Sequence, residues 1–166
     1  MNAPPSYLLD ANVFIEAARR YYAFDLVPRF WTSLEQLAQE GRVRSVDRVK
    51  QELVKGHDRL AEWAARDFVH GFASTDTAEV LAEFRRVIAW VTAQAQFSDA
   101  AKQQFASGAD GWLVAHAKAN GGVAVTQEQL SVDVRRRVPI PNVCKAFAVR
   151  YVDTFEMLRE LGVRLA

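Results

Sequence analysis

A short apolar run that ends abruptly on a carboxylate constrains this chain more than any other feature. Residues 7–9 (Tyr-Leu-Leu) are too few for an independent helix, and such aromatic and aliphatic runs are typical of a strand buried on both faces. Asp10 follows directly, with Asn12 two residues later. In an open parallel sheet, ligands collect beyond the carboxyl ends of the strands. The run therefore predicts a strand that delivers Asp10 and Asn12 to a site, unless either residue merely caps the helix expected over 13–20.

Three further short strands are expected at 43–46, 123–126 and 149–152, of which 123–126 is the clearest buried one, and helical patterns separate them. Alternating strands and helices indicate a parallel sheet covered by helices on both faces. We therefore predict an α/β protein of three layers, α/β/α, with a central parallel sheet of four to five strands. Two capped helical patterns between the strands expected at 43–46 and 123–126 predict a helical arm at about 74–107.

The length of 166 residues, half of them hydrophobic, is enough for one substantial core, so we expect a single domain over 1–166. No apolar run approaches the roughly 20 residues that span a bilayer, and the N-terminus lacks the basic and apolar regions of a signal peptide. We expect a cytoplasmic protein with no membrane partner. The single cysteine, Cys144, cannot form an internal disulfide and is expected to be a small buried residue.

The net charge of +1 does not indicate a nucleic-acid binder, so local clusters of charge matter more. Arg135, Arg136 and Arg137 form a basic run that could hold RNA phosphates, or could simply be a solvated face. The run lies in a polar connection, 129–138, that leads to a stiff loop expected at 139–142. A second basic cluster is open to the same two interpretations. It comprises Arg42, Arg44, Arg48 and Lys50.

Four acids occupy comparable places at the ends of predicted elements: Asp10, Glu52, Asp110 and Glu128. Carboxylates gathered without basic partners repel each other, and a hard divalent cation such as Mg²⁺ or Mn²⁺ relieves that repulsion. Such a cation can lower the pKa of a bound water and neutralise charge in an in-line phosphoryl displacement. The chemistry expected of this cluster is phosphodiester hydrolysis, with all four acids as candidate catalytic residues and metal ligands.

Other candidate sites carry weaker signals. The histidines are scattered without metal-ligand spacing, which argues against a zinc site. The aromatic cluster Tyr21, Tyr22 and Phe24 could stack on unpaired bases, but packing is the commoner role for such a cluster, and packing is what we expect.

The chain resembles the PIN domain family on four motifs that follow one another over nearly its whole length. They are Leu8-Leu9-Asp10-Ala11-Asn12, Val49-Lys50-Gln51-Glu52-Leu53, the helix start Asp110-Gly111-Trp112-Leu113, and Val125-Thr126-Gln127-Glu128. The resemblance implies Mg²⁺- or Mn²⁺-dependent cleavage of RNA, commonly by the toxin of a bacterial toxin–antitoxin pair. It also implies a cognate antitoxin protein as partner and, with the apolar stripe around Phe84 and Ile88, a homodimer.

One residue departs from the family pattern. The last acid of the family is usually an aspartate, whereas here Glu128 stands nearest, and Gln127 or Asp133 could take its part. We expect Asp10, Glu52 and Asp110 to reach one cation, Glu128 to act through an intervening water, and Asn12 and Thr126 to orient carboxylates or water.

Two alternative functions stay open. A haloacid-dehalogenase-like phosphatase also places an aspartate at this strand end, but a second aspartate usually stands where this chain has Asn12. A PIN-like module that binds RNA or a protein without cutting is the other alternative, because a clean fourth aspartate is missing.

Overall fold

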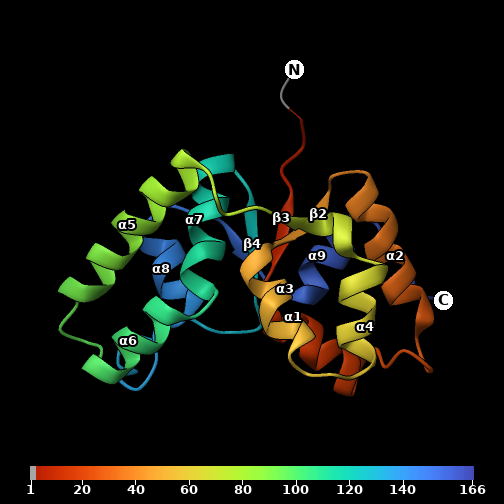
Figure 1. Ribbon diagram of the computed structural model, residues 1–166, viewed down its shortest axis with the longest axis horizontal. Helices are drawn as coiled ribbons and strands as arrows, with labels where there is room; N and C mark the ends of the chain where they lie inside the picture. Colours follow the sequence, from red (N-terminus) through yellow and green to blue (C-terminus); the bar gives the residue numbers. More distant parts are fainter. Residues whose placement is uncertain (1–2) are drawn as a thin grey trace.

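The computed structural model describes residues 3–166, which form a five-stranded parallel sheet between two groups of helices (Figure 1). The strand order is β3-β2-β1-β4-β5, so β1 occupies the centre. The predicted α/β class, the layering and the parallel sheet are thereby confirmed. The strands are β1 (Tyr7–Leu9), β2 (Val43–Val46), β3 (Phe72–Ala73), β4 (Val123–Val125) and β5 (Tyr151–Val152).

The two central strands, β1 and β4, are buried along their whole length, which explains their continuous apolar sequences. Leu8 pairs with Ala124 and Leu9 with Val125, both in parallel register. Because paired parallel strands end at the same edge of a sheet, the residues that follow β1 and β4 lie together there. The backbone N–H of Asp10 donates to the carbonyl of Val125 at 3.1 Å.

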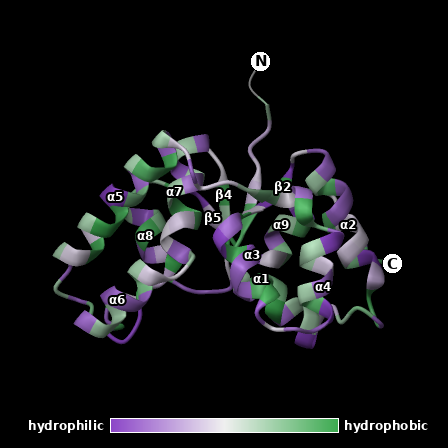
Figure 2. Cartoon of the chain, in the orientation of Figure 1, coloured by the Kyte–Doolittle hydropathy of each residue, from purple (hydrophilic) through white to green (hydrophobic). Residues whose placement is uncertain are grey.

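The helices lie in two groups on either side of this sheet. They are α1 (Ala11–Glu16), α2 (Pro28–Gln39), α3 (Asp47–Val54), α4 (Arg59–Arg66), α5 (Ala78–Ala93), α6 (Asp99–Ser107), α7 (Asp110–Asn120), α8 (Ile140–Ala146) and α9 (Thr154–Glu160). Helices α5 to α8 form one group, and α2, α4 and α9 belong to the other (Figure 1). The outer helices are banded hydrophilic and hydrophobic, as expected of helices with one face on a core (Figure 2). In residues 3–166, no helix is both long and apolar enough to cross a membrane.

An aromatic cluster fixes α1 against α2 and α4. The ring of Phe14 lies 5.8 Å from that of Trp63 and 5.6 Å from that of Phe68, and Trp31 meets Trp63 edge-on at 4.8 Å. All four side chains are almost fully buried. Such pairs add to the stabilisation by area burial, roughly 0.5–1.5 kcal/mol each. The packing sets the direction of the chain as it leaves β1, and with it the position of Asp10 and Asn12.

Several elements differ from those expected. The helix expected over 13–20 begins earlier, as α1, and continues as a π-helix, η1 (Ala17–Tyr21). The edge strand β3 has only two residues and leaves no pattern in the sequence; it follows the 3₁₀ turn η2 (Val69–Gly71). The loop expected at 139–142 is wrong, because α8 begins at Ile140 and a proline suits a first helical turn.

The cysteine lies where expected. Cys144 is fully buried, and burial raises the pKa of its thiol to about 12. A thiol with so high a pKa is poorly nucleophilic at neutral pH.

Candidate functional site

Asp10 is both a helix cap and part of an acidic cluster. Its Oδ1 accepts from the backbone N–H of Val13 at 2.8 Å, which caps α1, and its Oδ2 accepts from the hydroxyl of Thr126 at 2.8 Å. Thr126 can reach it because β4 pairs with β1 and both strands end at this edge. The side chain is only 1% exposed. The capping interpretation is therefore geometrically correct, and it coexists with the delivery of a carboxylate to the strand end.

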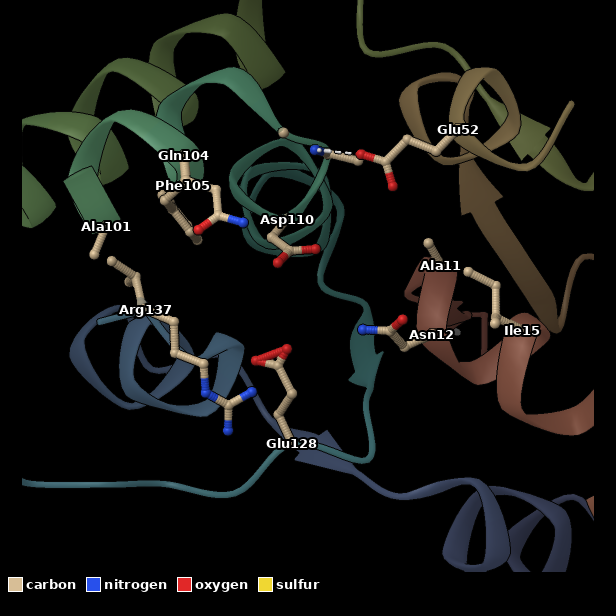
Figure 3. A pocket seen from close by; sticks show the side chains of 13 residues that line it. Ala11, Asn12, Ile15, Glu52, Ala101, Gln104, Phe105, Asp110, Glu128 and Arg137 are labelled. Carbon is tan, nitrogen blue, oxygen red and sulfur yellow. Dashed lines mark hydrogen bonds between the residues drawn. The ribbon is translucent and has the colours of Figure 1, made fainter. Parts of the chain in front are cut away.

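Asp110, the first residue of α7, points into a cavity of about 300 Å³ (Figure 3). The walls of this cavity also include Asn12, Glu52, Glu128 and Arg137, whereas the buried Asp10 is not part of them. Three of the four predicted acids therefore share one cavity, and the fourth lies at the adjoining strand end. The structure joins elements that are far apart in the sequence, because the chain returns to the same sheet edge after each strand.

A hydrogen bond and a close helix approach position the start of α7, where Asp110 lies. The backbone N–H of Ala109 donates to Oε1 of Glu52 at 3.2 Å, so α3 and α7 meet through that carboxylate. A Cβ added to Gly111 would lie 3.1 Å from the rings of Phe105 and Phe84. The absence of a side chain at Gly111 thus lets α7 begin close to α5 and α6.

Burial raises the pKa of both aspartates strongly. The pKa of Asp10 rises from 3.8 to about 7, mainly through burial; its bonds from Thr126 and Val13 oppose the rise, and the charges of Glu128 and Glu52 add to it. The pKa of Asp110 rises from 3.8 to about 8, through burial and then the charges of Asp10, Glu128 and Glu52. The acids are thus close enough to repel each other. Strongly shifted groups in a cavity are typical of functional sites.

Within residues 3–166, no arginine or lysine forms an ion pair with these acids. The ion pairs found there are Arg20 with Glu16, Arg86 with Glu83, and Arg150 with Glu160. Arg137 lines the cavity, and its guanidinium lies on the same side as Glu128 (Figure 3). The two side chains are not close enough to form an ion pair. No basic side chain of the described residues therefore neutralises the cluster, and in the absence of a cation the raised pKa values mean that protons do so in part.

Glu128 faces Asp110 across the cavity (Figure 3). Its Oε1 accepts from the backbone N–H of Ile140 at 3.0 Å, so it binds the start of α8, and its own N–H donates to the hydroxyl of Thr126 at 3.1 Å. Thr126 therefore links Asp10 to Glu128. One oxygen of Glu128 is committed to the helix start, and the other is available toward the cavity.

The acids surround the cavity without converging on one point. In the described part of the chain, no group of three or more His, Cys, Asp or Glu side chains is arranged to hold a metal ion. The oxygens of Asp110, Glu128, Glu52 and Asn12 are nevertheless the hard donors that Mg²⁺ and Mn²⁺ prefer. A hydrated cation needs only one or two direct carboxylates, and a cavity of this size has room for its waters.

The predicted basic run is only partly at the site. Arg137 lines the cavity, whereas Arg135 and Arg136 are exposed and outside its walls. Sequence reasoning missed Gln104 and Phe105 of α6, which also line it. No periodicity or motif distinguishes these two residues from their helical neighbours, so only the packing of α6 beside α7 could have identified them.

Comparison with known proteins agrees with this fold. A chain in the crystal structure of VapBC2 from Rickettsia felis bound to a DNA fragment from their promoter superposes with a TM-score of 0.53 and 16% identity. The match covers 89% of this chain and 97% of that one, and it indicates a shared PIN-like fold. None of the curated proteins matches the chain. A family model described as a domain of unknown function, DUF4411, matches residues 7–165. The chain therefore belongs to the DUF4411 family.

Proposed function

We propose that this protein is a metal-dependent ribonuclease that hydrolyses RNA phosphodiester bonds. One observation carries the proposal: Asp110, with its pKa raised to about 8, lines a cavity together with Glu52 and Glu128, and Asp10, with its pKa raised to about 7, adjoins it at the strand end. None of these acids has an ion-pair partner in residues 3–166. Unneutralised buried acids lower the stability of a fold. Their retention is best explained by a cation that binds there during function.

The donor set fits Mg²⁺ or Mn²⁺. We assign Asp110 and Glu52 as direct ligands and Glu128 as a ligand through water. Asp10 would add negative charge next to the cation without binding it directly. A bound divalent cation supplies a more acidic water and neutralises charge on the scissile phosphate. In the reaction, the oxygen of a water bonds to phosphorus and gives up a proton, while one ester P–O bond breaks and the leaving oxygen takes up a proton to become a hydroxyl.

Neutral and basic neighbours would position these groups. Thr126 holds Oδ2 of Asp10 and receives the N–H of Glu128, so it sets the orientation of two acids at once. The amide of Asn12 lies in the cavity wall, where it can donate to a phosphate oxygen or water. Arg137, at the same wall, is the basic residue best placed to bind a substrate phosphate.

We further propose that the enzyme is the toxin of a toxin–antitoxin pair and has a cognate antitoxin protein as partner. The support is the resemblance to PIN domains together with the structural likeness to a chain of the VapBC2 complex. A homodimer is part of the same proposal and rests on the resemblance alone, because the apolar stripe of α5 packs inward, with Val87 and Val91 buried and Phe84 stacked on Trp112.

A cleavage assay tests the activity. A mixed pool of single-stranded RNA is incubated with the full-length protein, with Mg²⁺ or Mn²⁺ and then with a chelator. We expect cleavage that stops on chelation and is absent in Asp110→Asn. Intact RNA at every Mg²⁺ and Mn²⁺ concentration, with folded protein, would contradict the proposal.

A non-cutting module that binds RNA or a protein is the second candidate. It is favoured by one observation, the lack of a ready-made group of three ligands in residues 3–166. The same assay separates the two, because the module would bind RNA or its partner with no dependence on divalent cations.

A further inference from the structure

A groove leads away from the acidic cavity along the carboxyl ends of β4 and β5. The first part of the groove shares Asn12, Glu128 and Arg137 with the cavity. It then joins a larger hollow of about 580 Å³, with which it shares Tyr21 and Gln127. An extended polymer that reaches the acids therefore has a continuous path beside them.

Aromatic side chains line the far part of this groove. Tyr21, at the end of η1, is 49% exposed, and Tyr151 is 37% exposed. The ring of Tyr21 meets Phe155 edge-on, at 5.7 Å and 86°, and both residues line the hollow. Exposed aromatic rings in a groove are the usual platform for unpaired bases, because every base has a π-face.

Tyr21 differs from its aromatic neighbours in the sequence. Tyr22 stacks on Phe30 at 4.4 Å, and Phe24 stacks on Trp31 at 3.9 Å, so both belong to the core. The packing expected for this cluster thus holds for two of its three rings. The π-helix places Tyr21 on the groove side, and π-helical turns occur frequently at functional sites.

Gln127 presents a fixed hydrogen-bond donor in the same groove. Its Oε1 accepts from the backbone N–H of Thr154 at 3.2 Å. That bond fixes the plane of the amide, and its Nε2 donates to no group in residues 3–166. A donor held in this way at an aromatic wall can recognise a carbonyl oxygen on a base edge.

The charged side chains of the groove make one part of it suitable for bases and another part suitable for phosphates. Asp153 and Glu156 line the aromatic part, so a phosphate or an acidic peptide would be repelled there. Arg137 lines the part next to the acids, where the backbone of a substrate must pass. The uncharged faces of bases are the portion of a nucleic acid that suits the aromatic part.

We propose that Tyr21, Tyr151 and Phe155 form a subsite that stacks unpaired bases of single-stranded RNA, with the Gln127 amide donating to a base. The subsite deepens the proposed function and rests on it, because it assigns the groove to the substrate of the acidic cavity. It predicts selectivity for single-stranded over double-stranded RNA, since paired bases cannot leave their stack to reach the rings.

Binding is measured on the full-length chain in the Asp110→Asn background, which lowers repulsion of the RNA and keeps it intact. The probe is a fluorescent single-stranded RNA of about eight nucleotides, within the usual site size. We expect Tyr21→Ala and Tyr151→Ala each to weaken binding about 5- to 100-fold, the range for losing one base stack. Tyr21→Phe keeps the ring and should bind as before. Leu26→Ala, a change at an apolar side chain that is 77% exposed and outside the groove, is the matched control.

A series of probes with one abasic nucleotide at successive positions makes the test specific. At one position the missing base should weaken binding to the parent protein and have no added effect in Tyr21→Ala. Binding of Tyr21→Ala and Tyr151→Ala equal to that of Leu26→Ala, at every probe, would overturn the subsite. If wild-type protein fails to cut RNA while the abasic coupling persists, the nuclease proposal fails and the subsite stands. If the protein cuts RNA and the coupling is absent, the nuclease proposal stands and the subsite fails.

Discussion

Carboxylates near the two ends of β1 have pKa values that are shifted in opposite directions. At the start of the strand, the hydroxyl of Tyr7 donates to Glu160 at 2.6 Å, and Arg150 donates to both oxygens of Glu160, at 2.8 and 2.6 Å. These partners lower the pKa of Glu160 from 4.5 to about 2, with the Arg150 bond as the largest cause. At the other end, the pKa values of Asp10 and Asp110 rise to about 7 and about 8.

The difference shows that this chain can neutralise a carboxylate with an arginine and does not do so at the acidic cavity. Glu160 ties α9 to the start of β1 and Arg150, which is a structural task suited to paired charges. Arg137 lies at the cavity wall and remains without an ion pair to the acids of residues 3–166. Carboxylates that are not paired with an arginine can exchange their protons for a cation, whereas a paired carboxylate is already neutralised.

The largest expected effect is on RNA cleavage, which should depend on the carboxylate at the acidic cavity and not on Glu160 at the start of β1. Asp110→Asn removes a charge that the cavity needs, so we expect cleavage of RNA to fall by at least about 100-fold, the loss typical of removing one group that stabilises transition-state charge. Glu160→Gln makes the same carboxylate-to-amide change at the other end of β1 and should leave cleavage intact. Rates measured at saturating Mn²⁺ check both. Equal losses in the two variants would remove the functional distinction between the ends.

The pH dependence of stability should follow the acidic cavity. Asp10 and Asp110 bind protons more tightly in the folded than in the unfolded chain, so metal-free stability should be highest near pH 4 and fall as the pH rises to about 8. We therefore expect the free energy of unfolding of the metal-free protein to decline over this range. Denaturant unfolding at several pH values measures it. Added Mg²⁺ should recover stability more at pH 8 than at pH 5.

Asp110→Asn is the matched variant for this measurement. The carboxylate of Asp110 accepts no hydrogen bond from residues 3–166, so the amide should fold normally and flatten the decline. A wild-type protein whose metal-free stability rises between pH 5 and pH 8 would contradict the raised pKa values.

Sequence alone predicts the centre of this fold better than its margins. The runs at β1 and β4 are apolar because both faces are covered, and that burial leaves a direct mark on the sequence. The two-residue β3 is too short to leave a pattern, and the π-helix that ends at Tyr21 looks like an ordinary helix in sequence. Local patterns report local burial, and short or distorted elements depend on contacts with distant parts of the chain.

The candidate site is likewise predictable from the sequence in part: its position is, and its detailed contacts are not. The order of strand ends predicts that the four acids lie at one edge of the sheet, and three of them line one cavity there. It does not indicate how closely they approach, and the side chains of residues 3–166 contain no ready-made group of three metal ligands. The binding of Glu128 to the start of α8 is not predictable from the sequence pattern, which indicates a loop where that helix begins.

A smaller effect concerns residues that orient the acids. Glu128→Gln keeps an oxygen for the N–H of Ile140 but removes the charge, so we expect the Mg²⁺ concentration for half-maximal cleavage to rise about tenfold, in the range known for groups outside the direct ligands. Thr126→Val removes the bond to Asp10 and should lower activity by a similar factor without abolishing it. Titrations with Mg²⁺ check both. An unchanged titration for Glu128→Gln would make Glu128 a structural residue of α8 alone.

The smallest expected effect is on stability and concerns Glu160, which pairs with residues near the start of β1. The pKa of Glu160 is lowered in the fold, so its pairing contributes stability above the unfolded pKa of about 4.5, and this contribution is lost as the pH falls toward about 2. Because the pair with Arg150 is open to solvent, screening keeps the contribution small. Glu160→Gln should therefore lower the free energy of unfolding slightly at pH 7, lose that deficit in acid and be partly masked by added salt. Unfolding curves at pH 7 and pH 3, each at low and high salt, measure it. A deficit that is larger in acid than at pH 7 would show that Glu160 acts through packing rather than charge, and that the two ends of β1 differ less than their pKa values indicate.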